Sequence, residues 1–353
     1  MAQSSEYVSA FAPAHVLLDA LRSRRVSAVE LLGMYRERIA KYNPVLNALV
    51  IPNDQEADSQ ARAADAALAL GAPMGALTGL PMTIKDCIET RGLPTTAGVP
   101  ERFGTIAAHD APIAGSVRAA GAVIMAKTNT STDCGDWQAD NALFGRTNNP
   151  WDLTRTPGGS TGGGAAALAA GLTALELGSD IGGSIRVPSA FCGLYGHRPS
   201  DSILPRYGFV PGWPAHNPGM MLQALGPLAR SPIDLELAMD VMVGPVAGED
   251  VAWRLQLAPA RRASLREYRV ALLPWQEWLP VDREIVTAFE DCADRLRKHG
   301  VHVETASPEG FDLQAQEELY ISLLAVMEGR ILTAKKRASL SAAARRTGSS
   351  IGA

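Results

Sequence analysis

Short apolar runs that end in polar or glycine-rich turns are the feature of this sequence that most restricts its fold. They lie at 81–85, 122–126 and 173–178, and their length is typical of strands rather than helices. A stretch with helical character at 112–120 separates the first two. Strands that alternate with helices form right-handed βαβ units, so the sequence predicts an α/β fold with a mainly parallel sheet. Ligands of such sheets bind beyond the carboxyl ends of the strands.

Residues 1–75 are predicted to form an N-terminal helical layer. Apolar residues recur at helical spacing at 14–23, 27–41 and 57–70. Ser27 and Glu30 have the spacing of a capping box, which marks the start of the second helix. We expect this layer to pack on an α/β core at 76–334 and to form a single domain with it.

Three segments of the second half differ in composition and in hydrophobic pattern. Residues 196–231 are rich in Gly and Pro and are predicted to be a loop that covers part of a site. Residues 269–305 are predicted to form a second βαβ unit, with strands at both ends and a helix at 282–298. The tail at 335–353 lacks a wide apolar face, so we expect a frayed helix or a disordered segment.

Composition excludes several classes of partner. The formal charge is −4, with 33 Lys and Arg against 37 Asp and Glu, so no basic face is expected and nucleic acid is not predicted as a partner. The start of the chain lacks the pattern of a signal peptide, and the longest apolar stretch is too short to span a bilayer. We therefore expect a cytoplasmic protein that does not bind membranes. The four cysteines are scattered without metal-ligand spacing, which favours reduced thiols and no metal.

Two glycine-framed serines carry the strongest chemical signal. Ser160 lies in the glycine-rich segment 156–164, and Ser184 lies in the segment 178–188. Glycines around a nucleophile let the backbone adopt positive φ angles and bring its N–H groups close to a bound carbonyl. Successive N–H groups that converge on one point stabilise a developing oxyanion, and residues 181–184 are candidates for this role.

A serine nucleophile needs a base, and the histidines of this chain do not provide an obvious one. None of the six histidines lies inside a recognisable G-x-S-x-G elbow with a distal acid. This argues against the α/β-hydrolase arrangement. Lys85 follows the apolar run 80–84 and should therefore lie at the end of a buried strand. Burial favours the neutral amine, which can accept a proton. Ser160 is then the candidate bridge between Lys85 and Ser184.

These motifs together resemble the signature of the amidase signature family. The resemblance rests on Gly-Gly-Ser-Thr-Gly-Gly at 158–163 and Gly-Ser-Asp-Ile-Gly-Gly-Ser-Ile-Arg-Val-Pro at 178–188. It extends to the segment that contains Lys85 and to the segment 144–151, and it covers roughly residues 60 to 245. The resemblance implies the amidase signature fold, a large mixed, mainly parallel twisted sheet covered by helices on both faces.

The resemblance also implies a catalytic apparatus. It assigns Ser184 as nucleophile, Ser160 as the bridging serine after a cis peptide bond, and Lys85 as the base. It implies an oxyanion hole of backbone N–H groups from Ile181, Gly182, Gly183 and Ser184. Residues that are expected to line the substrate pocket are Cys134, Gly135, Asp136, Trp137, Thr161 and Ser179. No metal or organic cofactor is implied.

Three functions are compatible with these motifs. The first is a free-standing amidase that hydrolyses carboxylic amides through an acyl-enzyme, with aryl amides, carbamates and esters as further substrates and a homodimer as the assembly considered. The second is a glutaminase like that of the tRNA-dependent amidotransferase, which works with partner chains. The third is a shortened inactive homologue, considered because family members usually extend beyond the point that matches residue 330.

The sequence departs from the family pattern within the first glycine motif. Thr161 replaces the second serine and keeps a hydroxyl, while Gly164 lacks the side chain that the family often has there. For several neighbours a structural role is also considered. Cys134 alone is typical of a small buried residue, and Asp180 and Arg186 are typical of structural hydrogen bonds and a local ion pair.

Overall fold

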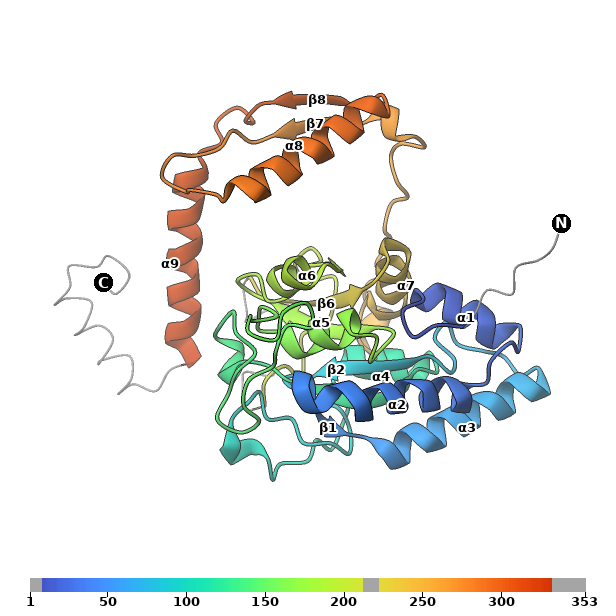
Figure 1. Cartoon of the computed structure of the whole chain (residues 1–353). Helices are drawn as coiled ribbons and strands as arrows, with labels where there is room; N and C mark the ends of the chain where they lie inside the picture. Colours follow the sequence, from blue (N-terminus) through green and yellow to red (C-terminus); the bar gives the residue numbers. More distant parts are fainter. Residues whose placement is uncertain (1–7, 212–221, 332–353) are drawn as a thin grey trace. The chain divides into compact units, whose positions relative to one another are not determined.

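The computed structural model describes residues 8–211 and 222–331 (Figure 1). The chain divides into two compact units, Met1–Leu255 and Gln256–Ala353. The predicted tail at 335–353 lies outside the described residues. The assignment of 76–334 to one domain stays a prediction.

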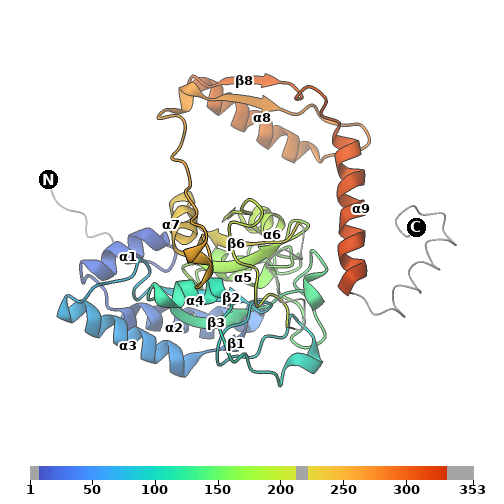
Figure 2. The same cartoon turned by 180° about the vertical axis from the view of Figure 1, so that it is seen from behind.

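Three helices begin the first unit: α1 (Ala14–Arg22), α2 (Ala28–Leu46) and α3 (Asp54–Leu70). The predicted capping box is confirmed, because the Ser27 hydroxyl accepts from the Glu30 N–H and the Glu30 carboxylate accepts from the Ser27 N–H. α2 continues through Pro44, beyond the predicted end, and stops where Asn47 adopts a φ of 51°. α2 and α3 lie side by side in both views (Figure 1, Figure 2). Leu17, Leu31 and Ala61 are among the buried residues of the three helices, so this layer contributes to the hydrophobic core.

The central sheet of the first unit has the strand order β1-β3-β2-β4-β6-β5. Its strands are β1 (Leu49–Pro52), β2 (Pro81–Lys85), β3 (Val123–Thr128), β4 (Glu176–Asp180), β5 (Tyr195–Gly196) and β6 (Ala224–Ala229). β2 pairs in parallel with both β3 and β4, whereas β1, β6 and β5 pair antiparallel. The predicted α/β fold with a mixed sheet flanked by helices is confirmed, with parallel pairing restricted to the centre of the described sheet.

The central strand β2 is buried along its whole length, which explains its apolar sequence. Side chains alternate between the two faces of a strand. Met82 and Ile84 therefore point into the main hydrophobic core, and Thr83 and Lys85 share the opposite face. That second face is the one that α5 (Gly162–Ala169) covers, since a Cβ atom at Gly164 would meet the side chain of Glu176, the partner of Thr83.

The segment 196–231 differs from the predicted loop. Its residues 224–229 form the buried strand β6, which pairs with β4 along the full length of β4. Before this strand, Leu204 and Phe209 are buried in the core, and Val210 N–H donates to the Cys87 carbonyl at 2.7 Å. The prediction of a loop is therefore wrong for the strand, and the stretch before it is anchored beside β2.

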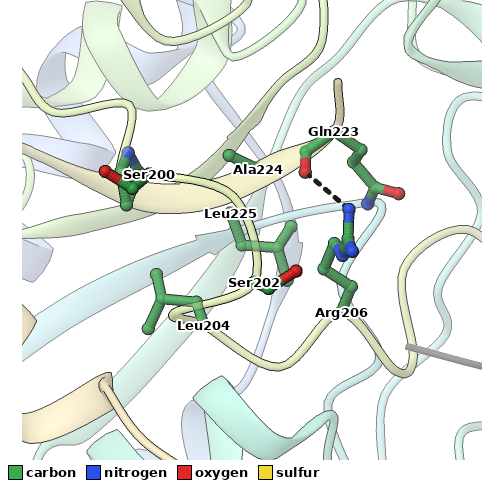
Figure 3. Close-up of a pocket in the computed structure, with 8 residues that line it drawn as sticks. Ser200, Ser202, Leu204, Arg206, Gln223, Ala224 and Leu225 are labelled. Carbon is green, nitrogen blue, oxygen red and sulfur yellow. Dashed lines mark hydrogen bonds between the residues drawn. The ribbon is translucent and has the colours of Figure 1, made fainter. Parts of the chain in front are cut away.

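A buried arginine joins the segment 201–206 to the residue before β6. Arg206 Nη1 donates to Asp201 at 2.9 Å and to the Gln223 carbonyl at 3.2 Å. Figure 3 shows this arginine beside Gln223, in a small hollow that Ser202 and Leu204 also line.

Three further helices complete the first unit: α4 (Pro112–Ala119), α6 (Arg186–Cys192) and α7 (Pro232–Met242). α7 contacts β6 and α4, and α6 contacts α5. α5, α6 and β6 share a small hydrophobic cluster that includes Ala165, Ile185 and Leu228. This cluster holds the start of α6 against α5, next to the two glycine-rich motifs.

The second unit contains β7 (Arg269–Leu272), α8 (Arg283–Lys298), β8 (His302–Thr305) and α9 (Leu313–Ile331). β7 and β8 pair in parallel, which confirms the predicted βαβ unit at 269–305. Asp282 caps α8, because its carboxylate accepts from the Glu284 N–H. No helix among the described residues is long and apolar enough to cross a lipid bilayer.

Candidate active site

Lys85 is the centre of the candidate site. It occupies the last position of β2 and is fully buried, as predicted from the apolar run before it. Its Nζ donates to Ser160 Oγ at 2.6 Å and to Ser179 Oγ at 2.9 Å. Ser179, which was expected to line the pocket, is therefore a second hydrogen-bond partner of this amine.

The loop that carries Ser160 is built on close backbone contacts. The predicted cis peptide bond is present between Gly159 and Ser160. A Cβ atom at Gly159 would lie 2.7 Å from Gln138 N, so only glycine fits where the two segments meet. Gly158 adopts a φ of +81°, which also favours glycine.

Ser184 lies beside Ser160, in the turn between β4 and α6. Thr161 N–H donates to the Ser184 carbonyl at 3.1 Å, and Thr161 Oγ1 donates to the Ser179 carbonyl at 3.3 Å. These bonds join the two glycine-rich motifs. Ser184 is nearly buried, at 7% exposure.

The turn after β4 is organised by Asp180. Its carboxylate accepts from Gly183 N–H at 2.9 Å, from Ile185 N–H at 3.0 Å and from Arg186 Nη2 at 2.8 Å. Burial acts to raise the pKa of Asp180, but Arg186 and the backbone donors outweigh it and lower the pKa below its usual value. The Arg186–Asp180 pair matches the structural role considered for both residues.

The Asp180 carboxylate also engages one of the N–H groups that were predicted to form the oxyanion hole. The predicted donors were the N–H groups of residues 181–184, and the N–H of Gly183 is committed to Asp180 in this structure. Gly183 has a φ of +114°, a conformation that L side chains rarely adopt. We therefore regard Gly183 as a residue that shapes the turn, which the sequence motif alone did not reveal.

The segment 134–137 adjoins both motifs. Trp137 Nε1 donates to the Gly182 carbonyl at 3.0 Å, although the indole ring is largely exposed. Gly135 N–H donates to the Thr132 carbonyl, and Asp136 is exposed while its backbone exchanges hydrogen bonds with Ser131. The Cys134 thiol lies 3.5 Å from Thr130 Oγ1. The segment thus lies against the turn that contains Ser184, and its place in a substrate pocket stays a prediction.

Glu176 is a buried group at this site that the sequence analysis missed. It is the first residue of β4, and it accepts from Thr83 Oγ1 at 2.5 Å and from Thr128 Oγ1 at 2.6 Å. Burial raises its pKa to about 7, against the opposing effects of these hydroxyls and of the charges on Lys85 and Lys127. The signal in the sequence was a carboxylate inside an otherwise apolar strand, which is rare without a partner.

A second buried lysine lies on the other side of the sheet. Lys127 Nζ donates to the Ile88 carbonyl at 2.5 Å and to Thr95 Oγ1 at 3.1 Å, and it lies 3.9 Å from Asp86 Oδ1. Burial lowers the pKa of Lys127. Its neighbours bind it as a structural cation, whereas Lys85 faces two serine hydroxyls. Within the described parts of the chain, no group of three His, Cys, Asp or Glu side chains is placed to hold a metal ion.

The chain matches the family model described as Amidase over residues 30–349. It is 37% identical over 290 residues to a glutamyl-tRNA(Gln) amidotransferase subunit of Methylobacillus flagellatus, and the match covers 81% of this chain and 58% of that protein. It is 36% identical over 288 residues to indoleacetamide hydrolase of Bradyrhizobium diazoefficiens, and the match covers 80% of this chain and 54% of that protein.

The fold is also that of solved structures. A bacterial aryl acylamidase of the amidase signature enzymes superposes with a TM-score of 0.80 at 26% identity, covering 92% of this chain and 67% of that chain. The present chain spans little more than half the length of the curated relatives that it matches.

Proposed function

Because the chain belongs to the amidase signature family, we propose that it hydrolyses carboxylic amide C–N bonds through an acyl-enzyme on Ser184. Aryl amides, carbamates and esters are further substrates within this proposal. The observation that carries it is the buried amine of Lys85, 2.6 Å from the hydroxyl of Ser160. A buried lysine whose neighbours are serine hydroxyls is suited to exchanging protons.

In the first step, the amine of Lys85 takes the proton of Ser160, while Ser160 takes the proton of Ser184. Ser184 Oγ then attacks the substrate carbonyl. The backbone hydrogen bond from Thr161, the residue after Ser160, to the Ser184 carbonyl supports this relay. Activation by an adjacent base is what converts a weakly nucleophilic hydroxyl into an effective one.

In the second step, the tetrahedral intermediate collapses. Backbone N–H groups in the turn after β4 stabilise the oxyanion, with Ile181, Gly182 and Ser184 as the donors that we assign. Ser160 returns a proton to the leaving amine, and the acyl group stays on Ser184. Water, deprotonated through the same relay, then hydrolyses the ester and restores the enzyme.

The experiment that tests this proposal is a hydrolysis panel of aliphatic amides, anilides, carbamates and esters. We expect Ser184→Ala to abolish turnover and the acyl-enzyme mass that a slow ester substrate leaves on wild-type protein. Ser116→Ala, in α4 and outside the site, is the matched control and should keep full activity. Turnover that persists in the folded Ser184→Ala variant would refute the proposal.

A second candidate is a glutaminase that delivers ammonia within a larger assembly. The relative of Methylobacillus flagellatus that is named for glutamyl-tRNA(Gln) amidotransferase favours it. Glutamine hydrolysis that exceeds hydrolysis of all other amides, together with copurification of a partner chain, would support this reading. A third candidate, an inactive homologue, predicts a folded protein whose Ser184 is never labelled by a fluorophosphonate.

A further inference from the structure

Glu176 and Lys85 lie on one face of the central sheet, on neighbouring strands. Glu176 pairs in register with Thr83, and Lys85 lies two positions beyond Thr83 on the same strand. Because side chains alternate along a strand, Thr83 and Lys85 share a face, and Thr83 Oγ1 donates to Glu176 Oε2 at 2.5 Å. The carboxyl group of Glu176 therefore lies on the face of β2 that carries the amine of Lys85.

A second hydroxyl ties the same carboxyl group to the neighbour of Lys85 on β3. Thr128 pairs in register with Lys85, and its Oγ1 donates to Glu176 Oε1 at 2.6 Å. Each oxygen of the carboxyl group is thus bound by a hydroxyl from a different strand. The side chain of Glu176 reaches across β2, which lies between β4 and β3, and joins the three strands next to Lys85.

The packing around Glu176 holds its carboxyl group in this place. Glu176 is fully buried, and a Cβ atom at Gly164 of α5 would lie 2.4 Å from its Oε1. The helix above and the two hydroxyls beside it therefore confine the carboxyl group. A buried carboxyl group is costly unless its partners compensate for the loss of water, and both of these hydroxyls are neutral.

Two lysines are the charged groups that act on Glu176 from the strands beside it, Lys85 from β2 and Lys127 from β3. β6, which pairs with β4, and α5, which covers it, contain no titratable residue. On β4 itself, Asp180 is bound to Arg186. Lys127 has a carboxylate neighbour of its own, whereas the hydrogen bonds of Lys85 go to two serine hydroxyls. Glu176 is thus the carboxyl group that is placed to balance a charge on Lys85.

The proposed relay creates such a charge. When Lys85 takes the proton of Ser160, its amine becomes an ammonium ion in a buried place where its hydrogen-bond partners are neutral. We propose that Glu176 is a positioning residue of the relay, which holds the strands around Lys85 and supplies the negative charge that stabilises the ammonium ion. This role rests on the proposed function, because it requires that Lys85 accepts a proton.

The charge of Glu176 changes with pH near neutrality. Burial raises the pKa of Glu176 to about 7, against the hydroxyls and the charges of the two lysines, which lower it. The carboxyl group is therefore mostly protonated at roughly pH 6 and mostly ionised at roughly pH 8. Because only the ionised form attracts the ammonium ion, the relay should become faster as the pH rises through 7.

The test measures the rate at which a fluorophosphonate labels Ser184 of the full chain, from about pH 5.5 to about pH 8.5. Labelling requires an activated serine but no amide, so it reports the relay independently of substrate identity. Glu176→Gln keeps the shape of the side chain and removes its charge. In this variant we expect the rise through pH 7 to disappear and the rate at about pH 8 to fall roughly tenfold, the effect of a charge interaction of one pKa unit. kcat/KM for any amide that the protein hydrolyses should follow the same pattern.

Thr83→Val and Thr128→Val provide a second measurement. Each removes a hydroxyl that lowers the pKa of Glu176 and keeps the carboxyl group. The rise in labelling should therefore remain, and its midpoint should move above pH 7. The matched control is Asp234→Asn, which removes the charge of another fully buried carboxylate, bound to the first residues of α1. This variant should keep the wild-type dependence on pH.

Stability distinguishes the charge of Glu176 from a structural role. As the pH rises, Glu176→Gln should gain stability relative to wild type while its labelling becomes relatively slower, whereas damage to the fold would lower both. A folded Glu176→Gln protein with the wild-type pH profile would overturn the role of Glu176 and leave the proposed function intact, as would valine variants whose midpoints do not move. Wild-type protein that is never labelled at Ser184 would overturn the proposed function, and the role of Glu176 with it.

Discussion

Lys85 and Lys127 show how the same side chain takes different roles on the two faces of one sheet. Both are fully buried and lie on adjacent strands. Lys127 is bound by a backbone carbonyl, a threonine and the carboxylate of Asp86, a set that stabilises a cation. Lys85 meets two serine hydroxyls that can both donate and accept. The difference lies in the partners rather than in burial.

We expect Lys85→Met to lower kcat/KM for a reactive amide by roughly 10²–10⁴-fold, the usual loss when a general base is removed. The matched variant Lys127→Met should instead lower the free energy of unfolding by roughly 3 kcal/mol, because Asp86 is left buried without its cation. Steady-state kinetics and urea unfolding of both variants provide the measurements. An equal loss of kcat/KM in both folded variants would contradict the distinction between them.

Glu176 predicts a pH dependence of stability. Its pKa is about 7 in the folded protein and near 4.5 when exposed, so the folded state binds the proton more tightly. The stabilisation is complete below about pH 4.5, and it is lost as the pH rises toward 7, by at most about 1.4 kcal/mol per pH unit. Glu176→Gln should remove this component.

The measurement is urea unfolding of wild-type protein and Glu176→Gln at several pH values across this window. Other carboxyl groups titrate alike in both proteins, so the difference between the two curves isolates Glu176. We expect the variant to gain stability relative to wild type as the pH rises. A difference that stays constant with pH would show that Glu176 does not titrate there.

At the scale of elements, the strands that the sequence predicted are the buried central ones. β2 and the runs that became β3 and β4 are short and apolar, because neighbours cover both of their faces. β6 was missed because it contains Gly226 and Pro227, which ordinarily argue against a strand. Glycine is needed at 226, where a Cβ atom would lie 2.3 Å from the His197 carbonyl oxygen. That contact is long-range, so no local pattern could reveal it.

The residues of the proposed relay could be predicted because, unlike β6, they depend on local patterns in the sequence. Ser160, Ser184 and Lys85 lie in motifs whose residue types are set by local backbone geometry, and the sequence displays them directly. The roles of Glu176 and Ser179 depend on partners from other strands. Only the fold brings Glu176 to Thr83 and Thr128, or Ser179 to Lys85.

The packing of α5 on β4 explains the departure from the family pattern at Gly164. A Cβ atom at this position would lie 2.4 Å from the carboxyl carbon of Glu176, so the side chain of Glu176 fills the space. We expect Gly164→Ala to destabilise the protein by roughly 1–3 kcal/mol, as overpacking does. The double variant with Glu176→Ala should recover part of this loss, since the clash is removed.

The control for this prediction is Gly33→Ala in α2. A Cβ atom at Gly33 would meet nothing within 4 Å, so this change should stabilise the helix by up to about 1 kcal/mol. Thermal and urea unfolding of the single and double variants measure both effects. If Gly164→Ala were as well tolerated as Gly33→Ala, the proposed packing of Glu176 under α5 would be wrong.

At the scale of the whole molecule, the described residues of the candidate site all belong to one unit. Lys85, Ser160 and Ser184 lie within Met1–Leu255, together with the central sheet. Ser179, the other hydrogen-bond partner of Lys85, lies there too, and the second unit has its own small βαβ arrangement. The proposed relay is therefore built from the first unit, and a cut between the two units should leave its residues on one fragment.

Arg261 and Arg262 lie in the exposed stretch 256–264, which contains no helix or strand. Exposed segments of this kind are preferred sites of proteolytic cleavage. We expect brief trypsin treatment to cut here and the fragment with the first unit to keep labelling of Ser184 by a fluorophosphonate. Ser184→Ala protein treated in the same way is the control for labelling elsewhere. If cleavage at these arginines abolished labelling while the fragment stayed folded by circular dichroism, the second unit would be needed for the reactivity of Ser184.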